Sequence, residues 1–359
     1  MEKKKRVLLG MSGGVDSSVS AILLKEQGYE VIGITMKLWE SEEEENIEGG
    51  CCNLSSTSDA KRVCDYLEIP HYTLNLKEEF KNRVINDFCA CYAKCKTPNP
   101  CIECNKYLKF GVMYQKAKEL ECDYIATGHY AKTEFDEKYG KYVLKKSNAG
   151  RKDQSYVLYS IDKNLLDKIL FPLNEFEDKS QIRKIAEEHG LQIAHKPDSE
   201  DICFIPDGDY KKFLEENSDI KQNPGNIVHV DGKILGKHNG LYNYTIGQRK
   251  GLGIANPVPL FVVGFNKEKN EVIVGESDKL FSKELYLEDV NLLLVDEILE
   301  KTEVMAKIRY SAKEAKAFIY PLQDGKMKVE FEEPQRAITP GQSVVFYIDD
   351  VVLGGGKII

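Results

Sequence analysis

Close to its start the sequence reads Gly10-Met11-Ser12-Gly13-Gly14-Val15-Asp16-Ser17-Ser18. The apolar residues 7–9 before this stretch predict a buried strand, and the apolar residues 19–24 after it predict a helix that stops at Gly28. The glycines therefore stand in a strand-to-helix turn, where backbone N–H groups can approach a ligand closely. Such amides, together with the helix N-terminus, form a binding site for phosphate.

The polar side chains of this turn support an anion site. Ser12, Ser17 and Ser18 supply hydroxyl donors, and Asp16 adds a carboxylate that makes sense if it holds Mg²⁺ bound to the same phosphates. The turn is neither a GxxxxGK[ST] loop, because it lacks the lysine, nor a GxGxxG loop. A glycine- and serine-rich turn without a ligand is the alternative, and the agreement of residue types, order and context disfavours it.

Composition limits the possible classes of protein. A length of 359 residues favours two or three domains, and a net charge of −8 means that any nucleic-acid contact needs a local basic surface. The sequence has no apolar run of membrane-spanning length and no signal-peptide pattern, so we expect a cytoplasmic protein with no membrane partner. Ten cysteines in such a chain indicate reactive, metal-bound or buried thiols rather than a disulfide framework.

The order of the predicted elements indicates an α/β domain followed by β-rich domains. Residues 31–38 predict a second strand directly after the first helix, which gives a βαβ unit and a doubly wound parallel sheet. A strand at 124–127 places Gly128 and His129 at the sheet edge where ligands gather, although His129 is assigned no catalytic role. Beyond residue 210, short strands predict a small mixed domain and then a barrel. The predicted domains are 1–205, 206–280 and 281–359.

The sequence allows several interpretations of the roles of the cysteines. Cys91 and Cys95 are spaced i,i+4 on a predicted helix, where core packing is favoured over metal binding. Residues 97–105 contain two prolines and predict a stiff, non-helical loop. Its Cys101-x-x-Cys104 pair fits a redox pair, half of a zinc site, or two iron–sulfur ligands. A lone cysteine such as Cys203 is usually a buried hydrophobe, but its surroundings are too acidic for a simple core strand.

Together, these motifs resemble those of the tRNA-specific 2-thiouridylases over the whole length of the chain. The matching segments are GMSGGVDSSVSA at 10–21, Met36 to Trp39, TPNP-x-x-x-CNK at 97–106, DYIATGHYA at 123–131, KDQSY at 152–156, D-S-x-x-I-C-F-I at 198–205, T-x-GQRKGLGI at 245–254, TPGQS at 339–343 and LGGG at 353–356. The resemblance implies an adenine nucleotide alpha-hydrolase-like domain with a pyrophosphate-binding loop, as in ATP pyrophosphatases. It also implies ATP-dependent 2-thiolation of the tRNA wobble uridine, with ATP and Mg²⁺ as cofactors and AMP and pyrophosphate as products.

The resemblance also carries residue roles. It implies an ATP site made by Gly10, Met11, Ser12, Gly13, Gly14, Val15, Asp16, Ser17, Met36 and Gly128. It implies a target-base loop of Asn99, Pro100 and Cys101, and tRNA contacts from Lys152, Asp153, Gln154, Arg309 and Tyr310. A wider basic surface of Lys145, Lys146, Arg151, Lys152, Arg249, Lys250 and Arg309 is expected to meet tRNA phosphates.

Two chemistries are compatible with the resemblance. In one, Cys203 receives persulfide sulfur from a cysteine desulfurase or sulfur-relay protein, and Cys104 is the catalytic cysteine, close enough to form a disulfide with Cys203 when oxidised. In the other, Cys101, Cys104 and Cys203 hold a four-iron cluster. Cys101 stands where many relatives carry Asp, a change that keeps a possible ligand. We adopt the persulfide relay for assigning roles.

Two further readings remain as alternatives. A ligase resembling argininosuccinate or guanylate synthases would share the phosphate loop, but it needs no paired cysteines and no added β domains. A metal-binding, nucleic-acid-binding protein without catalysis would leave the Asp16-containing loop unexplained. A chain ending near residue 206 is expected to bind ATP if its core stays closed, and to thiolate tRNA poorly.

Overall fold

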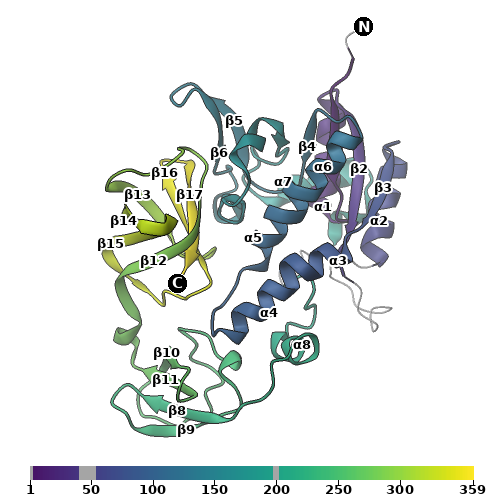
Figure 1. Ribbon diagram of the computed structural model, residues 1–359. Coiled ribbons are helices and arrows are strands. Elements are labelled where there is room, and N and C mark those ends of the chain that lie inside the picture. Colours follow the sequence, from purple (N-terminus) through teal and green to yellow (C-terminus); the bar gives the residue numbers. More distant parts are fainter. Residues whose placement is uncertain (1–2, 40–53, 197–201) are drawn as a thin grey trace. The chain divides into compact units, whose positions relative to one another are not determined.

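The computed structural model describes residues 3–39, 54–196 and 202–359 (Figure 1). The chain divides into two compact units. The first comprises residues 1–85, 100–208 and 350–352, and the second comprises residues 86–99, 209–349 and 353–359.

The first unit is built on a five-stranded parallel sheet in the order β3-β2-β1-β4-β7. Its strands are β1 (Arg6–Gly10), β2 (Glu30–Lys37), β3 (His71–Asn75), β4 (Tyr124–Ala126) and β7 (Ile169–Leu170). This confirms the predicted parallel sheet. Because β2 and β4 lie on opposite sides of β1, the strand order reverses there, and ligands of doubly wound sheets bind at the carboxyl end of such a strand.

The central strand explains why its sequence is apolar without interruption. Val7 and Leu9 belong to a core that also contains residues of α1 (Val15–Glu26), α2 (Leu54–Tyr66) and α7 (Lys179–Glu188). Leu8, which points to the opposite face, is fully buried as well. Strands covered on both faces have continuous apolar runs instead of alternating ones.

The other elements of the first unit surround this sheet. They are α3 (Lys77–Phe80), the π-helical η1 (Lys81–Ile85), α5 (Pro100–Cys104), η2 (Asn105–Val112), α6 (Met113–Glu119), the hairpin of β5 (Lys132–Asp136) and β6 (Lys141–Lys145), η3 (Gly150–Lys152), η4 (Ser155–Leu158), η5 (Lys163–Lys168) and η6 (Gln192–His195). The hairpin turns at Gly140, which has a φ of +63°.

The second unit contains a four-stranded sheet in the order β10-β11-β8-β9 and a closed six-stranded barrel. The sheet strands are β8 (Gly225–His229), β9 (Ile234–His238), β10 (Phe261–Asn266) and β11 (Glu271–Gly275). The barrel strands are β12 (Phe281–Leu292), β13 (Thr302–Lys307), β14 (Ala315–Pro321), β15 (Met327–Arg336), β16 (Ser343–Ile348) and β17 (Val351–Ile358). The barrel closes because β12 pairs with both β15 and β17, which confirms the predicted barrel.

Helix α4 (Asn86–Ala93) also belongs to the second unit, where it packs on α8 (Tyr210–Asn217). The ring centroids of Phe88 and Phe213 are 6.2 Å apart, and Tyr92 stacks on Tyr210 at 5.0 Å. A chain ending near residue 206 would therefore leave the apolar face of α4 exposed to solvent.

Two local predictions are wrong. Cys91 and Cys95 do not share a helix, because α4 ends at Ala93 and Cys95 has a left-handed φ of 57°. The proline-rich segment 97–105 is not entirely a loop, because α5 begins at Pro100, and proline is well accepted in a first helical turn, where its missing N–H would have no partner.

Candidate functional site

The stretch 10–18 forms the predicted turn between β1 and α1. Gly13 has a φ of +71°, and Gly14 is the residue before the first helical residue, Val15. The turn is held by its own hydroxyls: the Ser12 N–H donates to Ser17 Oγ at 3.2 Å, and Ser18 Oγ donates to the Gly14 carbonyl at 2.9 Å. Gly14 offers no side chain for capping, so the amides that begin α1 are left for another acceptor, as in an anion site.

Two close backbone approaches explain the glycines on either side of this turn. A Cβ on Gly13 would lie 2.1 Å from the carbonyl oxygen of Ser56 in the first turn of α2. A Cβ on Gly128, after β4, would lie 3.0 Å from the Asp16 carbonyl carbon and from the Ser17 nitrogen. The ends of β1 and β4 and the start of α2 therefore converge on the turn, as the reversal of strand order requires.

Asp16 is the charged centre of the turn. Tyr130 donates its hydroxyl to Asp16 Oδ1 at 2.8 Å, and the Lys179 ammonium lies 2.9 Å from Asp16 Oδ2. The side chains of Asp16 and Lys179 are 29% and 13% exposed, so the ion pair is partly shielded from water. Both carboxylate oxygens thus have partners, and a cation bound by Asp16 would have to exchange with Lys179.

The sequence analysis missed both partners of Asp16. Lys179 is the first residue of α7 and lies 163 positions from Asp16, so no local spacing links the two. One lysine among 50 basic residues carries no signal by itself. Tyr130 stood inside the quoted DYIATGHYA segment and was the one available hint.

The other residues expected at the nucleotide site lie around the same edge of the sheet. Met36 is half-buried near the end of β2, beside Thr35, which donates its hydroxyl to the Met11 carbonyl at 2.8 Å. Thr35 Oγ1 is also 2.8 Å from His71 Nε2, and burial lowers the pKa of His71, which favours a neutral ring there. These contacts hold the entrance of the turn in place.

His129 has a structural setting. Its Nδ1 is 2.8 Å from Thr127 Oγ1, and its ring lies near the rings of Phe110 and Phe171. Burial is the main reason that its pKa lies well below the usual value. A neutral imidazole among aromatic rings agrees with leaving His129 without a catalytic role.

The three cysteines singled out by the resemblance differ in exposure. Cys101 is exposed and Cys104 is buried at the end of α5, while Cys203 is half-buried. Helix α5 packs against η1, and Phe204, the neighbour of Cys203, packs on Phe80 with ring centroids 5.4 Å apart. The segments carrying Cys104 and Cys203 thus both lie against the continuous helical stretch 77–85. Residues 198–201 of the D-S-x-x-I-C-F-I segment lie outside the described residues.

The described side chains fit one of the two expected metal sites and not the other. Among the described residues, no group of three or more His, Cys, Asp or Glu side chains is placed to share a metal ion, so Cys101, Cys104 and Cys203 do not form a three-ligand site in this conformation. Asp16 does fit a magnesium site, because Mg²⁺ is commonly held by one or two carboxylates together with phosphate oxygens and water.

The segment 152–154 contains one exposed cation and two residues that make hydrogen bonds within the protein. Lys152 is exposed, whereas Asp153 is buried and accepts hydrogen bonds from the Ser147 N–H at 2.9 Å and the Ser155 hydroxyl at 2.6 Å. Gln154 accepts the Tyr130 N–H at 2.9 Å through its side chain. Lys152 is thus the exposed cation of this segment, and Gln154 holds Tyr130, the residue that contacts Asp16.

Lys145, which was expected to contact tRNA phosphates, is paired with carboxylates of the same hairpin. Its ammonium lies 2.7 Å from Asp136 and 2.9 Å from Glu134, and its side chain is 14% exposed. Hydrogen bonds to these two carboxylates raise the pKa of Lys145 above its usual value. The remaining basic candidates in the first unit are Lys146, Arg151 and Lys152.

In the second unit, the start of the target-base loop is fixed by the TPGQS segment. The Thr97 N–H donates to the Pro340 carbonyl at 2.8 Å, and the Gln342 side chain donates to the Thr97 carbonyl at 2.9 Å. Gly341, with a φ of +90°, passes so close that a Cβ would lie 2.8 Å from the Thr97 nitrogen.

Of the two residues of the second unit expected to contact tRNA, Arg309 is half-buried and Tyr310 is exposed.

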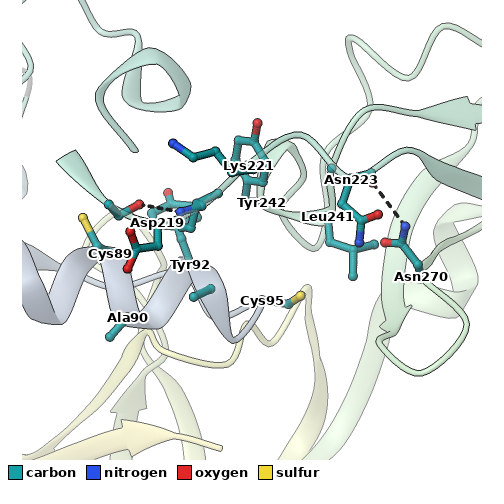
Figure 2. A pocket seen from close by; sticks show the side chains of 14 residues that line it. Cys89, Ala90, Tyr92, Cys95, Asp219, Lys221, Asn223, Leu241, Tyr242 and Asn270 are labelled. Carbon is teal, nitrogen blue, oxygen red and sulfur yellow. Dashed lines mark hydrogen bonds between the residues drawn. The ribbon is translucent and has the colours of Figure 1, made fainter. Parts of the chain in front are cut away.

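A cavity of about 440 Å³ lies in the second unit between α4 and residues 218–270 (Figure 2). Cys89 and Cys95 line it, and burial raises the pKa of both thiols. Protonated thiols are poor nucleophiles, so the cavity does not resemble a second sulfur-transfer site.

None of the helices in the described part of the chain is long and apolar enough to cross a membrane.

Comparisons with known proteins agree with this architecture. Family models match residues 5–207 as a tRNA methyl transferase HUP domain, 211–276 as a tRNA methyl transferase PRC-barrel domain, and 282–358 as an aminomethyltransferase beta-barrel domain. The chain is 54% identical to a tRNA-specific 2-thiouridylase MnmA of Acetivibrio thermocellus over 357 residues, 99% of each chain. It is 50% identical to the protein of that name from Clostridioides difficile, over all of this chain and 99% of the relative.

Similarity to solved structures is weaker. A 4-thiouridine synthetase–RNA complex with bound ATP is 18% identical, with a TM-score of 0.36, covering 59% of this chain and 50% of that one. The full-length matches to curated relatives and the three consecutive domain models agree in order and extent. The chain belongs to the family of the tRNA-specific 2-thiouridylases.

Proposed function

We propose that this protein catalyses the ATP-dependent 2-thiolation of the wobble uridine of tRNA. The observation that carries the proposal is the turn after β1: a phosphate-type strand-to-helix turn with Asp16 in the first helical turn, in a chain that matches 2-thiouridylases from end to end. The C2 oxygen of uracil is a poor leaving group. Attached to AMP it becomes a good one, and this attachment is what a pyrophosphate-binding loop provides.

Adenylation is the first step. The C2 oxygen forms a bond to the α-phosphorus of ATP, and the bond between that phosphorus and the bridging oxygen breaks, so pyrophosphate leaves. The turn 10–18 and the start of α1 hold the phosphates through backbone N–H groups. Mg²⁺, held by Asp16 and phosphate oxygens, would neutralise developing charge on the leaving pyrophosphate.

Lys179 takes the place of the lysine that the turn itself lacks. Its ammonium lies 2.9 Å from Asp16 and is therefore within reach of the same anion site. When Asp16 turns to a metal ion, Lys179 loses that partner and can pair with phosphate oxygens instead. Tyr130 retains its hydrogen bond to Asp16 and fixes the direction of the carboxylate.

Sulfur transfer is the second step. The terminal sulfur of a persulfide on Cys203 attacks C2, and AMP leaves with the former C2 oxygen. The Cys104 thiolate then attacks the inner sulfur of Cys203, which releases 2-thiouridine and leaves a Cys104–Cys203 disulfide. An external thiol must reduce this disulfide, and a cysteine desulfurase or sulfur-relay protein must reload Cys203.

The target base must leave the anticodon stack to react. Asn99, Pro100 and Cys101 are the proposed base loop, and the fastening of Thr97 by Pro340 and Gln342 gives this loop a fixed start. Lys152, Arg309 and Tyr310 are proposed to contact tRNA, with Asp153 and Gln154 holding the segment of Lys152.

The test is to incubate the protein with unmodified tRNA, ATP, Mg²⁺, a thiol reductant, and a cysteine desulfurase with cysteine as the persulfide donor, and to analyse nucleosides and nucleotides. The expected products are 2-thiouridine, AMP and pyrophosphate. Formation of ADP and phosphate, or AMP release that does not depend on tRNA and leaves no 2-thiouridine, would contradict the proposal. Asp16→Ala is expected to abolish adenylation and leave the fold intact, because Asp16 is partly exposed.

A further inference from the structure

A chain of hydrogen bonds crosses from the outer strand β3 over β2 to the phosphate turn. His71 on β3 is the register partner of Gly33 on β2, and Thr35 stands two residues after Gly33. Residues two apart on a strand share a face, so these three positions lie on one side of the sheet. From there His71 Nε2 reaches to 2.8 Å from Thr35 Oγ1.

Gly33 leaves the space that this contact needs. A Cβ on Gly33 would lie 2.7 Å from Cys64 Sγ and 3.4 Å from His71 Cδ2. Met11 Cγ, which belongs to the residue after β1, would be 3.2 Å away. Glycine weakens the interior of a strand and occurs where other groups approach closely. The space over Gly33 is thus filled by side chains from both neighbouring strands.

The chemistry of the groups fixes the direction of these hydrogen bonds. A threonine hydroxyl has one proton, and a backbone carbonyl can only accept. Thr35 donates its proton to the Met11 carbonyl at 2.8 Å, so the ring of His71 must donate from Nε2 to Thr35 Oγ1. Burial lowers the pKa of His71 and favours a neutral ring, whose one proton is then on Nε2.

Met11 is thereby held on both sides of its backbone. Its N–H donates to the Ile34 carbonyl at 2.8 Å, and its carbonyl accepts the Thr35 hydroxyl. Met11 is 2% exposed, so little water can reach this carbonyl in place of Thr35. Ser12 and the two glycines follow directly, so the direction in which the phosphate turn leaves the sheet is set at Met11.

We propose that Thr35 and His71 are positioning residues for nucleotide binding, and that His71 acts through Thr35 as its Nε2–H tautomer. Both act on the nucleotide through the Met11 carbonyl, which keeps the turn in the conformation that binds phosphate. The proposal rests on the proposed function for the presence of a nucleotide at this turn. It makes ATP affinity depend on a histidine of the outermost strand.

The experiment compares Thr35→Val, Thr35→Ser, His71→Phe and the double variant Thr35→Val/His71→Phe in the full-length protein. Thr73→Val is the matched control, because Thr73 is the register partner of Thr35 on β3 and is exposed. The first readout is the dissociation constant of α,β-methylene-ATP with Mg²⁺, an analogue that cannot be cleaved between its α and β phosphates. The second readout is tRNA affinity in a filter-binding assay.

We expect Thr35→Val to raise the dissociation constant of the analogue about 5- to 10-fold, because the buried Met11 carbonyl loses its hydrogen bond. His71→Phe is expected to have a smaller effect in the same direction, since Thr35 can still donate to Met11. The double variant is expected to bind as weakly as Thr35→Val alone, because His71 acts through Thr35. Thr35→Ser is expected to keep the wild-type affinity, as is the Thr73→Val control, and tRNA affinity is expected to stay constant throughout.

The tautomer of His71 has a test of its own. Long-range proton–nitrogen NMR spectra of protein with labelled histidine distinguish a ring protonated at Nε2 from one protonated at Nδ1. The His71 signals are those that disappear in His71→Phe. We expect the Nε2–H pattern, and the Nδ1–H pattern would overturn the proposal.

Unchanged analogue affinity in folded Thr35→Val would also overturn it, as would additive losses in the double variant or an equal loss of tRNA affinity. Thermal melting identifies variants that do not fold. If Thr35→Val is one of them, His71→Phe decides instead, because His71 is only half-buried. Failure of the proposed function looks different: the wild type would bind the analogue and make no 2-thiouridine. A wild type that does not bind the analogue would overturn both.

Discussion

Replacement of Lys179 by methionine separates structural from catalytic roles at the phosphate turn. The substitution keeps an apolar stem of similar length and removes the ammonium 2.9 Å from Asp16. Side-chain exposures of 13% and 29% place this pair between exposed pairs, worth about 0.2–1 kcal/mol, and buried ones, whose disruption costs about 3–5 kcal/mol. We therefore expect the free energy of unfolding to fall by about 1–2 kcal/mol.

The catalytic effect is expected to be larger than the effect on stability. If Lys179 binds phosphate oxygens in the transition state of adenylation, its loss removes one preorganised cation, and removal of one such group costs about 10²–10³-fold in rate, or about 2.7–4 kcal/mol. The assay is tRNA-dependent pyrophosphate release, run beside thermal melting of the same sample. Lys184→Met is the control, since Lys184 lies on the same helix with a side chain that is 75% exposed.

A particular outcome would refute this reasoning. If Lys179→Met lowers the melting temperature but releases pyrophosphate within about threefold of the wild-type rate, Lys179 is only a counter-ion for Asp16. Tyr130→Phe gives an independent check, because Tyr130 is buried and the change removes only the hydroxyl that donates to Asp16. We expect it to raise the Mg²⁺ concentration needed for half-maximal rate, because a carboxylate without that donor is less well oriented.

Three further predictions follow from the remaining contacts. Lys145→Met is expected to lower the melting temperature and to leave tRNA affinity unchanged in a filter-binding assay, because Glu134 and Asp136 already occupy its ammonium. Neutralising any one true phosphate contact is expected to reduce the slope of log affinity against log salt by about one, and an affinity that does not change with salt would contradict the basic surface. The candidates are Lys146, Arg151, Lys152, Arg249, Lys250 and Arg309. Cys101→Ser is expected to retain most activity if persulfide transfer operates; stoichiometric iron and acid-labile sulfide in anaerobically purified protein, together with an inactive variant, would establish the cluster instead.

Much of the fold was predictable because its signals are local. The phosphate turn lies between an apolar strand and a helix ended by Gly28, and the structure places β1, the turn and α1 at those positions. The short strands beyond residue 260 and the hairpin at Gly140 were likewise visible from period-2 patterns and turn residues. In these segments local preference and tertiary environment agree.

The wrong predictions occur where local signals are ambiguous or absent. Two nearby prolines, Pro98 and Pro100, predict a non-helical loop, yet Pro100 is the first residue of α5. A proline in the first helical turn destabilises a helix very little, and the sequence does not show which of the two prolines begins one. Lys145 belongs to a basic run in the sequence, but its ammonium contacts Glu134 and Asp136 of the neighbouring strand β5. Contacts between strands cannot be predicted before the pairing of the strands is known. Lys179 and Asp16 are 163 positions apart in the sequence, and only the folded chain brings them together, so no local pattern predicts this pair.

That long-range pairing also explains how the turn can lack a lysine of its own. A lysine within the turn would stay beside the phosphates at every stage, whereas Lys179 comes from the start of α7 and has Asp16 as an alternative partner. Without nucleotide, the pair neutralises a carboxylate that would otherwise repel the incoming phosphates. In the proposed mechanism, the Asp16 carboxylate would turn to the metal and the Lys179 ammonium to the nucleotide phosphates, so that each charge would keep an opposite partner.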